Sequence, residues 1–252
     1  MVALDRWALA RARAVQEDVI AAYRKYEFHA IYQKVHNFCV VDMGGVYLDI
    51  IKDRTYTMPT QSVGRRSAQT AMFHIAEAMV RWLAPILSFT AEEMWGFLPG
   101  KRPESVFLTT WYSLPEVPAD GINWDKLLEL RAGVQKKLEE KRIKGEIGAP
   151  LEAEVDVQVP REAFDKLNAL GKELRFFLIT SEAQLNAVDA ELEKAGDAVV
   201  NGAAIFVHPT DAAKCARCWH RRPEVGSIAA HPELCERCVA NITTAGEKRV
   251  FV

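Results

Sequence analysis

Four of the five cysteines in this 252-residue chain stand in two pairs near its carboxyl end, and they constrain the fold more than any other feature. Cys215 and Cys218 form one C-x2-C pair, Cys235 and Cys238 form the other, and sixteen residues separate the two pairs. This spacing is typical of four-cysteine zinc sites, in which each two-residue gap lets both sulfurs of a pair bind one tetrahedral ion. The pattern therefore predicts one zinc ion held by all four thiolates.

A site closed by four thiolates leaves no position for a reactive water, so the predicted zinc ion would be structural. The alternative interpretations are two disulfides, or four thiols that are simply buried. Disulfides are characteristic of secreted proteins. The segment Met1–Asp5 lacks the apolar core of a signal peptide, and no run of about eighteen apolar residues could span a bilayer. We therefore expect a reducing, cytoplasmic setting and no membrane association.

The charge of the chain does not identify a partner. With 32 basic and 34 acidic residues and a formal net charge of −2, the chain is not a polycation that would coat nucleic acid. Residues 211–252 hold seven Lys or Arg against five Asp or Glu, an excess that four thiolates would cancel. Any contact with nucleic acid must therefore come from local patches.

Residues 1–114 show the apolar spacing of three and four residues that indicates helices, and they predict a bundle of four or five. Asp5 is the expected N-cap of the first helix. Gly44 and Gly45 are expected to break the chain before a helix around Val46–Ile51. A further helix is predicted over Ser67–Leu83.

The last predicted helix of this half has a well-defined start. Thr90 and Glu93 have the spacing of a capping box, and Phe89 is placed to pack back onto the first turn. Trp82, Phe89 and Trp95 follow the helical period, so we expect all three side chains in the core.

The segment SLPEVPADGIN ends this half, because two prolines and a glycine separate two different periodic patterns. Residues 115–209 predict a small α/β subdomain with a long basic helix, and residues 210–252 form the zinc module. The expected elements are a helix over Trp124–Lys144, an alternating strand over Leu151–Val159, a helix from Pro160 to about Leu174, and strands at Phe176–Ile179 and Ala203–Val207. The predicted fold is mainly α, with a helical bundle, an α/β subdomain and a zinc ribbon in that order.

No common catalytic motif is found. The sequence contains no phosphate-binding G-x-x-x-x-G-K-[ST] loop, no G-x-G-x-x-G, no H-E-x-x-H and no G-x-S-x-G. Cys39, the fifth cysteine, lies at the apolar end of a predicted helix and is interpreted as core packing. We therefore expect that this chain by itself is not an enzyme.

Several stretches together resemble the carboxy-terminal part of bacterial isoleucyl-tRNA synthetases, which are class I enzymes. They are WLAPILSFTAEEMW at Trp82–Trp95, YLDIIKDRTY at Tyr47–Tyr56, KGEIGAPLEAEV at Lys144–Val155, FFLITS at Phe176–Ser181, and the tail with CARCW and LCERC. The first two stretches are shared with the valyl and leucyl relatives, whereas the four-cysteine tail is similar to the terminal zinc module of the isoleucyl enzymes. The tail is also similar to the zinc finger of formamidopyrimidine-type DNA glycosylases.

The resemblance implies that residues 1–114 are an anticodon-binding domain and that the partner is isoleucine tRNA. The family's HIGH-like and KMSKS-like motifs are absent from this sequence. The domains for catalysis and editing, with their ATP, would thus precede this region in the whole protein, which attaches isoleucine to its tRNA and which we expect to be a monomer. The alternative is a non-catalytic zinc ribbon that binds DNA or another protein.

Within this interpretation, side chains beside the first cysteine pair are the best candidates for RNA contacts. A planar guanidinium and an indole held by a metal-fixed backbone suit unstacked bases, and nearby cations suit phosphates. The alternative for Trp219 is packing as the small core of the zinc ribbon, and for Arg65 and Arg66 a solvated helix end. The predicted tRNA-binding residues are Arg217, Trp219, His220, Arg221, Arg222, Arg65 and Arg66.

Overall fold

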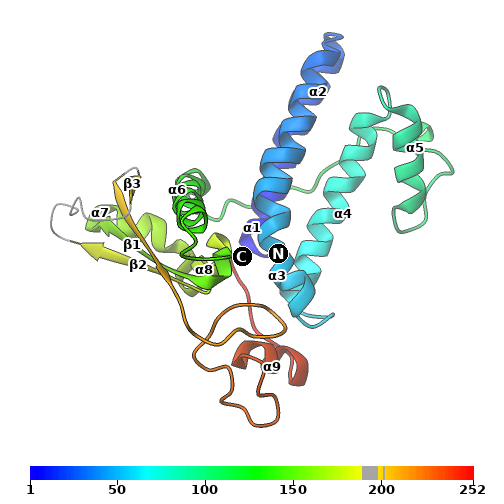
Figure 1. Cartoon of the computed structure of the whole chain (residues 1–252). Coiled ribbons are helices and arrows are strands. Elements are labelled where there is room, and N and C mark those ends of the chain that lie inside the picture. Colours follow the sequence, from blue (N-terminus) through cyan, green and yellow to red (C-terminus); the bar gives the residue numbers. More distant parts are fainter. Residues whose placement is uncertain (189–197, 201) are drawn as a thin grey trace. The chain divides into compact units, whose positions relative to one another are not determined.

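The computed structural model describes residues 1–188, 198–200 and 202–252, and it divides into two compact units (Figure 1). The first unit comprises Met1–Ile51 and Arg65–Pro118, and the second comprises Lys52–Gly64 and Ala119–Val252. The expectation of a mainly helical chain with one small sheet is confirmed. In the described part of the chain, no helix is both long and apolar enough to cross a membrane.

The amino-terminal half of the chain is helical. Its elements are α1 (Ala3–Arg24), α2 (Phe28–Asn37), a π-helical segment (Phe38–Tyr47), α3 (Leu48–Thr57), α4 (Val63–Leu83), α5 (Ser88–Phe97) and a short 3-10 turn (Val106–Leu108). α1 and α2 pack against each other as a helical hairpin. Trp82 and Trp95 are buried, as predicted, and the Trp82 indole donates a hydrogen bond of 2.8 Å to the Gln16 side-chain oxygen.

The predicted break at Gly44-Gly45 is wrong, because α2 continues through the π-helical segment into α3. In this segment each turn is widened, and carbonyl groups five residues back come close to the glycines. A Cβ atom on Gly44 would lie 3.1 Å from the Cys39 carbonyl oxygen, and one on Gly45 would lie 3.3 Å from that of Val40. The two glycines therefore relieve crowding inside a continuous helix. Cys39 itself is only half-buried, and burial raises the pKa of its thiol.

Asp5 does not cap α1, contrary to the prediction. The helix begins at Ala3 after Val2, and Asp5 lies fully buried in the first turn. Its carboxylate accepts a hydrogen bond of 2.7 Å from the Tyr47 hydroxyl and another from the Ser67 hydroxyl. The Ser67 oxygen accepts in turn from the Val2 backbone N–H at 2.8 Å. Asp5 thus joins helices that are distant in sequence instead of ending one.

The predicted capping box at Thr90 is also wrong. α5 begins at Ser88, so Thr90 lies inside the helix, and no side chain caps the start. Phe89 is 93% exposed and not in the core. The N-cap position is Leu87, three residues earlier than predicted, so Phe89 lies within the helix and faces solvent, while Trp95 is on the buried side with Ala91. The sequence pattern therefore predicted this helix correctly, but not its first residue or the direction in which Phe89 faces.

The second unit is built on a mixed four-stranded sheet with the order β2-β1-β4-β3 (Figure 1). β1 runs parallel to β2 and antiparallel to β4, with Val157 opposite Leu185 and Ile205. β1 shows the predicted alternation of buried and half-buried residues. The helices α6 and α8 pack on this sheet through apolar side chains that include Leu127, Val134 and Phe177. The strands are β1 (Ala153–Pro160), β2 (Glu182–Val188), β3 (Ala198–Val200) and β4 (Ala203–Pro209), and the helices are α6 (Trp124–Ile143), α7 (Arg161–Leu167), α8 (Leu174–Leu178) and α9 (Glu236–Thr243).

The strand predicted at Phe176–Ile179 is wrong, because these residues end the short helix α8. The predicted helix before it stops at Leu167 and gives way to a 3-10 segment. Short apolar runs that are buried on all sides fit a strand and a helix equally well. Ile179 takes a left-handed conformation with φ of 59° and turns the chain from α8 toward β2. The strand predicted at Ala203–Val207 is confirmed as β4.

The Tyr47→Phe substitution tests the buried network of the first unit. It removes one donor from the Asp5 carboxylate and keeps the ring, so we expect the free energy of unfolding to fall by about 1 to 2 kcal/mol. Urea denaturation followed by circular dichroism measures this change. The control is Tyr32→Phe, the same change on an exposed tyrosine. Equal denaturation midpoints for the two variants would show that the Asp5 network does not stabilise the unit.

Candidate functional site

The four paired cysteines come together in one buried cluster. The thiol sulfurs of Cys215, Cys218, Cys235 and Cys238 all lie within 4.8 Å of one another. The Cys218 and Cys235 sulfurs are 3.6 Å apart. A tetrahedral zinc ion with Zn–S bonds of about 2.3 Å needs sulfurs roughly 3.8 Å apart. The donor set and its spacing therefore fit one zinc ion.

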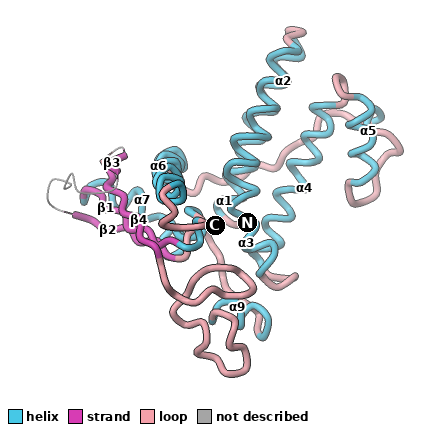
Figure 2. The backbone as a smooth tube through the Cα atoms, in the orientation of Figure 1, coloured by secondary structure: helices cyan, strands magenta, loops and turns pink. Residues whose placement is uncertain are grey.

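Local backbone hydrogen bonds shape the turn that holds the first pair. Around the first pair, the Cys215 N–H donates to the His220 carbonyl at 2.9 Å, and the Trp219 N–H donates to the Cys215 carbonyl at 3.0 Å. In the second pair Cys235 precedes α9, and Cys238 lies in the first turn of that helix. Figure 2 shows that most of the chain between β4 and α9 is loop. Tight turns and one short helix, rather than a sheet, thus position the sulfurs.

The four thiols lie close enough to shift one another's pKa values. Hydrogen bonds from Cys218 and Cys238 lower the pKa of Cys235 to about 4. Hydrogen bonds with Cys218, and then with Cys235, raise the pKa of Cys238 far above its ordinary value. Sulfurs this close cannot all be thiolates unless a positive charge lies among them. A bound divalent ion would allow all four to be deprotonated.

Trp219 is the exposed aromatic residue of this cluster. Its side chain is 62% exposed, and the ammonium of Lys214 lies 5.6 Å from the centre of its ring. Its backbone has a φ of 67°, in the left-handed region that a bulky residue rarely adopts. Trp219 therefore does not form a core for the zinc turn.

The other predicted residues of the turn contact groups within the second unit. Arg217 donates to the Thr57 carbonyl at 2.6 Å. His220 is buried, with its ring edge-on to Phe176, which does not fit the prediction that it contacts phosphates. Two further arginines pair with nearby carboxylates: Arg221 with Glu152 at 3.1 Å, and Arg222 with Glu182 at 2.6 Å and Glu224 at 3.2 Å.

An ion-pair network around Asp53 holds the zinc cluster to two other segments of the second unit. Arg237, between the two cysteines of the second pair, donates to both Asp53 carboxylate oxygens at 2.6 and 2.8 Å. Arg249 donates to the same carboxylate at 2.8 Å, and Glu247 pairs with both arginines. Burial alone would raise the pKa of Asp53, but the charge and hydrogen bonds of Arg237, then the charge of Arg249, hold it well below its ordinary value.

Comparison with known families agrees with this arrangement. Residues 5–158 match the family described as the anticodon-binding domain of tRNA ligase. The chain belongs to this family of anticodon-binding domains. Residues 213–241, which include all four clustered cysteines, match the zinc finger found in FPG and IleRS. The zinc-finger match and the clustered thiols together support one structural zinc ion.

Proteins named isoleucine–tRNA ligase are similar to this chain over essentially all of its residues. The protein of Nitrosococcus oceani is 54% identical over 256 residues, which cover 100% of this chain and 27% of that protein. The protein of Halorhodospira halophila is 52% identical, with 99% and 27% covered, and that of Pseudomonas aeruginosa is 53% identical, with 100% and 27% covered. The chain thus spans about a quarter of the length of these relatives.

The two predicted arginines of the anticodon-binding domain lie in the first turn of α4, which starts earlier than expected, at Val63. Arg66 is exposed and donates to the Gln69 side chain at 3.2 Å. Arg65 is half-buried. Their contact with RNA stays a prediction.

Sequence reasoning missed the Asp53 network. Asp53 lies in α3. Its partners Arg237 and Arg249 are 184 and 196 residues away in the sequence. The only local signal was the presence of an arginine inside the second cysteine pair.

Replacing Asp53 with Asn should destabilise the second unit, because Glu247 would then be the one carboxylate among the described residues that pairs with the two buried guanidinium groups. We expect a loss of about 3 kcal/mol in the free energy of unfolding at pH 7. A carboxyl with a lowered folded-state pKa stabilises fully above about pH 4 and loses this effect as the pH falls further. The difference between the two proteins should therefore shrink below pH ~4.

Urea denaturation at several pH values measures this difference. Asp211→Asn, the same change at an exposed position of the same unit, is the control and should have little effect. If Asp53→Asn were as stable as the Asp211 variant at pH 7, the network would not stabilise the unit.

Proposed function

We propose that this chain binds the anticodon stem-loop of an isoleucine tRNA, with Trp219 as the side chain that stacks on an unpaired base. The observation that carries the proposal is an exposed indole on a strained backbone directly after a zinc-site cysteine. Single-stranded bases are commonly bound by stacking on aromatic side chains. The family membership supplies the class of partner, and Trp219 supplies a contact of the required chemistry.

The backbone strain at Trp219 supports a functional role. A bulky residue with positive φ costs on the order of 1 to 3 kcal/mol and persists only where its surroundings determine the conformation. Here the surroundings are the turn that joins Cys215 and His220. A residue without a Cβ would satisfy the turn at less cost. An aromatic residue in this position, facing solvent, therefore suggests selection for binding.

The four cysteines are the proposed ligands of the structural zinc ion. Four thiolates close the coordination shell, so the ion would fix the turn and leave no open position for a substrate. With the turn fixed, the indole of Trp219 can meet RNA with little loss of conformational entropy. The arginines beside it hold the protein together, so we assign the base contact to Trp219 and not to Arg217, Arg221 or Arg222.

For the whole protein we propose the activity that the names of its relatives state, the joining of isoleucine to tRNA. Activation with ATP and editing would be carried out by upstream parts of that protein. We further propose that it is cytoplasmic and monomeric, and that residues 1–114, 115–209 and 210–252 act as anticodon-binding bundle, α/β subdomain and zinc module. The alternative, a zinc ribbon that binds duplex DNA or another protein, is not favoured, because the match to anticodon-binding domains covers residues 5–158.

Replacing Trp219 with Ala should weaken binding of isoleucine tRNA by about 5- to 150-fold, the range of one base-stacking contact. Trp219→Phe should retain most of the affinity, because it keeps an aromatic face. Phe89→Ala, the loss of an exposed aromatic side chain in the helical half, is the matched control. Filter binding at one fixed salt concentration measures all four proteins, and duplex DNA serves as competitor. Unchanged affinity in Trp219→Ala would refute the base contact.

Removal of zinc should reduce tRNA binding in the same way. A chelator would release the four thiolates, and the turn that presents Trp219 would lose its support. We expect about one zinc ion per chain by metal analysis, and restored binding when zinc is added back. Full affinity for tRNA in the zinc-free protein would show that the ion stabilises the fold but does not contribute to tRNA binding.

A further inference from the structure

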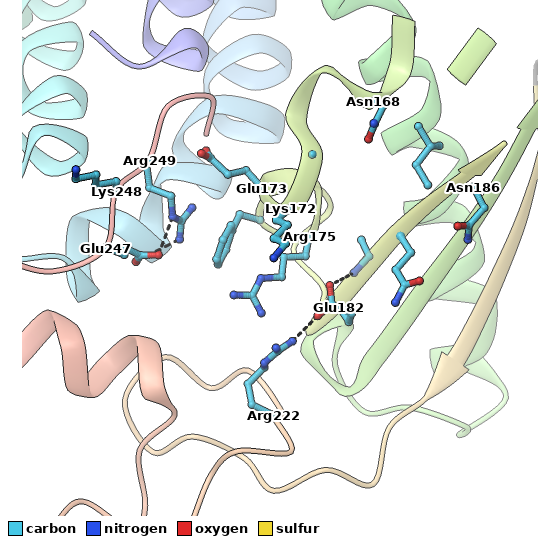
Figure 3. A pocket seen from close by; sticks show the side chains of 15 residues that line it. Asn168, Lys172, Glu173, Arg175, Glu182, Asn186, Arg222, Glu247, Lys248 and Arg249 are labelled. Atoms are coloured by element: carbon cyan, nitrogen blue, oxygen red, sulfur yellow. Dashed lines mark hydrogen bonds and ion pairs between the residues drawn. The ribbon is translucent and has the colours of Figure 1, made fainter. Parts of the chain in front are cut away.

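A second feature of the zinc-containing unit is an open pocket of about 740 Å³ (Figure 3). It is lined by α8 and the segment before it, by β2, by Arg222 and by residues 247–249. Its size is in the range of pockets that hold small molecules or single chemical groups. No part of the proposed base contact at Trp219 uses this pocket.

The pocket carries more positive than negative charge. Three carboxylates line it, those of Glu173, Glu182 and Glu247. Five cations line it, those of Lys172, Arg175, Arg222, Lys248 and Arg249. The five-to-three ratio alone does not make an anion site, because ion pairs within the wall could neutralise most of it. Whether the pocket can bind an anion depends on which of these charged groups already have partners.

All three carboxylates have other partners. Glu182 pairs with Arg222 at 2.6 Å, and Glu247 pairs with Arg249 at 2.9 Å. Glu173 accepts hydrogen bonds of 2.9, 3.0 and 2.7 Å from the backbone N–H groups of residues 250–252. Each carboxylate is therefore committed to holding the wall of the pocket.

Arg175 has no such partner. Among the described residues, no carboxylate lies within ion-pair distance of its guanidinium, and its one hydrogen bond is a long one of 3.4 Å to the Ser181 carbonyl. The group lies 4.5 Å from the centre of the Phe176 ring, and Figure 3 shows its side chain between those of Arg222 and Arg249. Burial, and then the charge of Arg222, lower the pKa of Arg175, although an arginine keeps its proton in proteins. The charge of Glu182 partly offsets this effect, but no carboxylate among the described residues pairs directly with this half-buried cation.

We propose that this pocket binds a phosphate group through the Arg175 guanidinium, with Lys172 and Lys248 completing the charge at its exposed edge. Both lysines are exposed and form no ion pair with the described residues. A guanidinium fork matches two phosphate oxygens, and a phosphate would supply the missing counter-charge.

The RNA backbone is the source of phosphate that the structure favours, and this part of the inference depends on the proposed function. Arg222, in the pocket wall, follows Trp219 by three residues, which limits the distance between their Cα atoms to about 11 Å. A strand with a base stacked on Trp219 would therefore have phosphates close to the pocket. A free phosphate ion is the other source of the same chemistry.

The test uses Arg175→Met and Arg175→Lys in the 252-residue chain. Lys101→Met is the control, because it removes one exposed cation that has no ion pair with the described residues. Binding of isoleucine tRNA is measured over a series of salt concentrations. We expect Arg175→Met to weaken binding by about tenfold and to reduce the slope of log Kd against log salt by about one. Arg175→Lys should keep the slope and recover part of the affinity, because a lysine holds phosphate without the fork.

Zinc content and circular dichroism establish that the variants are folded. If Arg175→Met does not fold, the double variant Lys172→Met and Lys248→Met at the exposed edge replaces it, with the same expected fall in slope. If Trp219→Ala weakens tRNA binding while Arg175→Met and the double variant leave affinity and slope unchanged, the phosphate pocket is wrong and the proposed function stands.

Inorganic phosphate separates the two sources. A rise in melting temperature with phosphate in the parent chain, and not in Arg175→Met, together with no dependence of tRNA binding on Arg175, would assign the pocket to a free anion and not to RNA. If the parent chain bound no tRNA, the same phosphate titration would still support the pocket while the proposed function failed. No response to phosphate and no effect of Arg175 on tRNA would refute the pocket.

Discussion

The Asp53 carboxylate is the point on which the second unit depends most. It receives three charged hydrogen bonds from Arg237 and Arg249, and these arginines come from α9 and from the carboxyl-terminal segment. Because Arg237 stands between Cys235 and Cys238, the ion pair and the thiol cluster use the same turn of chain. A buried charge network of this kind stabilises only when all members are present. The metal site and the salt bridges therefore support each other.

This dependence explains how the cations of the zinc module are used. Arg217, Arg221 and Arg222 all bind acceptors within their own unit. Most of the local positive charge is thus paired with acceptors inside the folded unit. Trp219 remains turned to solvent. In such a module a few positioned side chains, and not the total charge, make the specific contacts. The small net charge of the chain is consistent with this.

Local signals in the sequence predicted much of this structure. Three predicted features depend on neighbours in the chain: the alternation in β1, the helix predicted over Trp124–Lys144 and the clustering of the cysteines. All three appear in the structure, with the helix ending at Ile143. Errors arose where tertiary packing decides. Gly44 and Gly45 fit a widened helix as well as a break, and the apolar residues Phe176–Leu178 are buried in a way that suits a strand or a helix, so each pattern is compatible with two structures. The network at Asp53 joins residues nearly 200 positions apart, which no local pattern encodes.

The left-handed backbone at Trp219 has a consequence for how this protein can change over evolutionary time. Glycine would adopt this φ without the strain that an indole side chain brings, so a random substitution there could make the protein more stable. Stability alone would therefore drive the tryptophan out of this position. Folding alone therefore does not account for a tryptophan here, and the turn around the cysteines is what makes the strained residue tolerable. The zinc module thus lets the chain keep a side chain that is poor for its own stability.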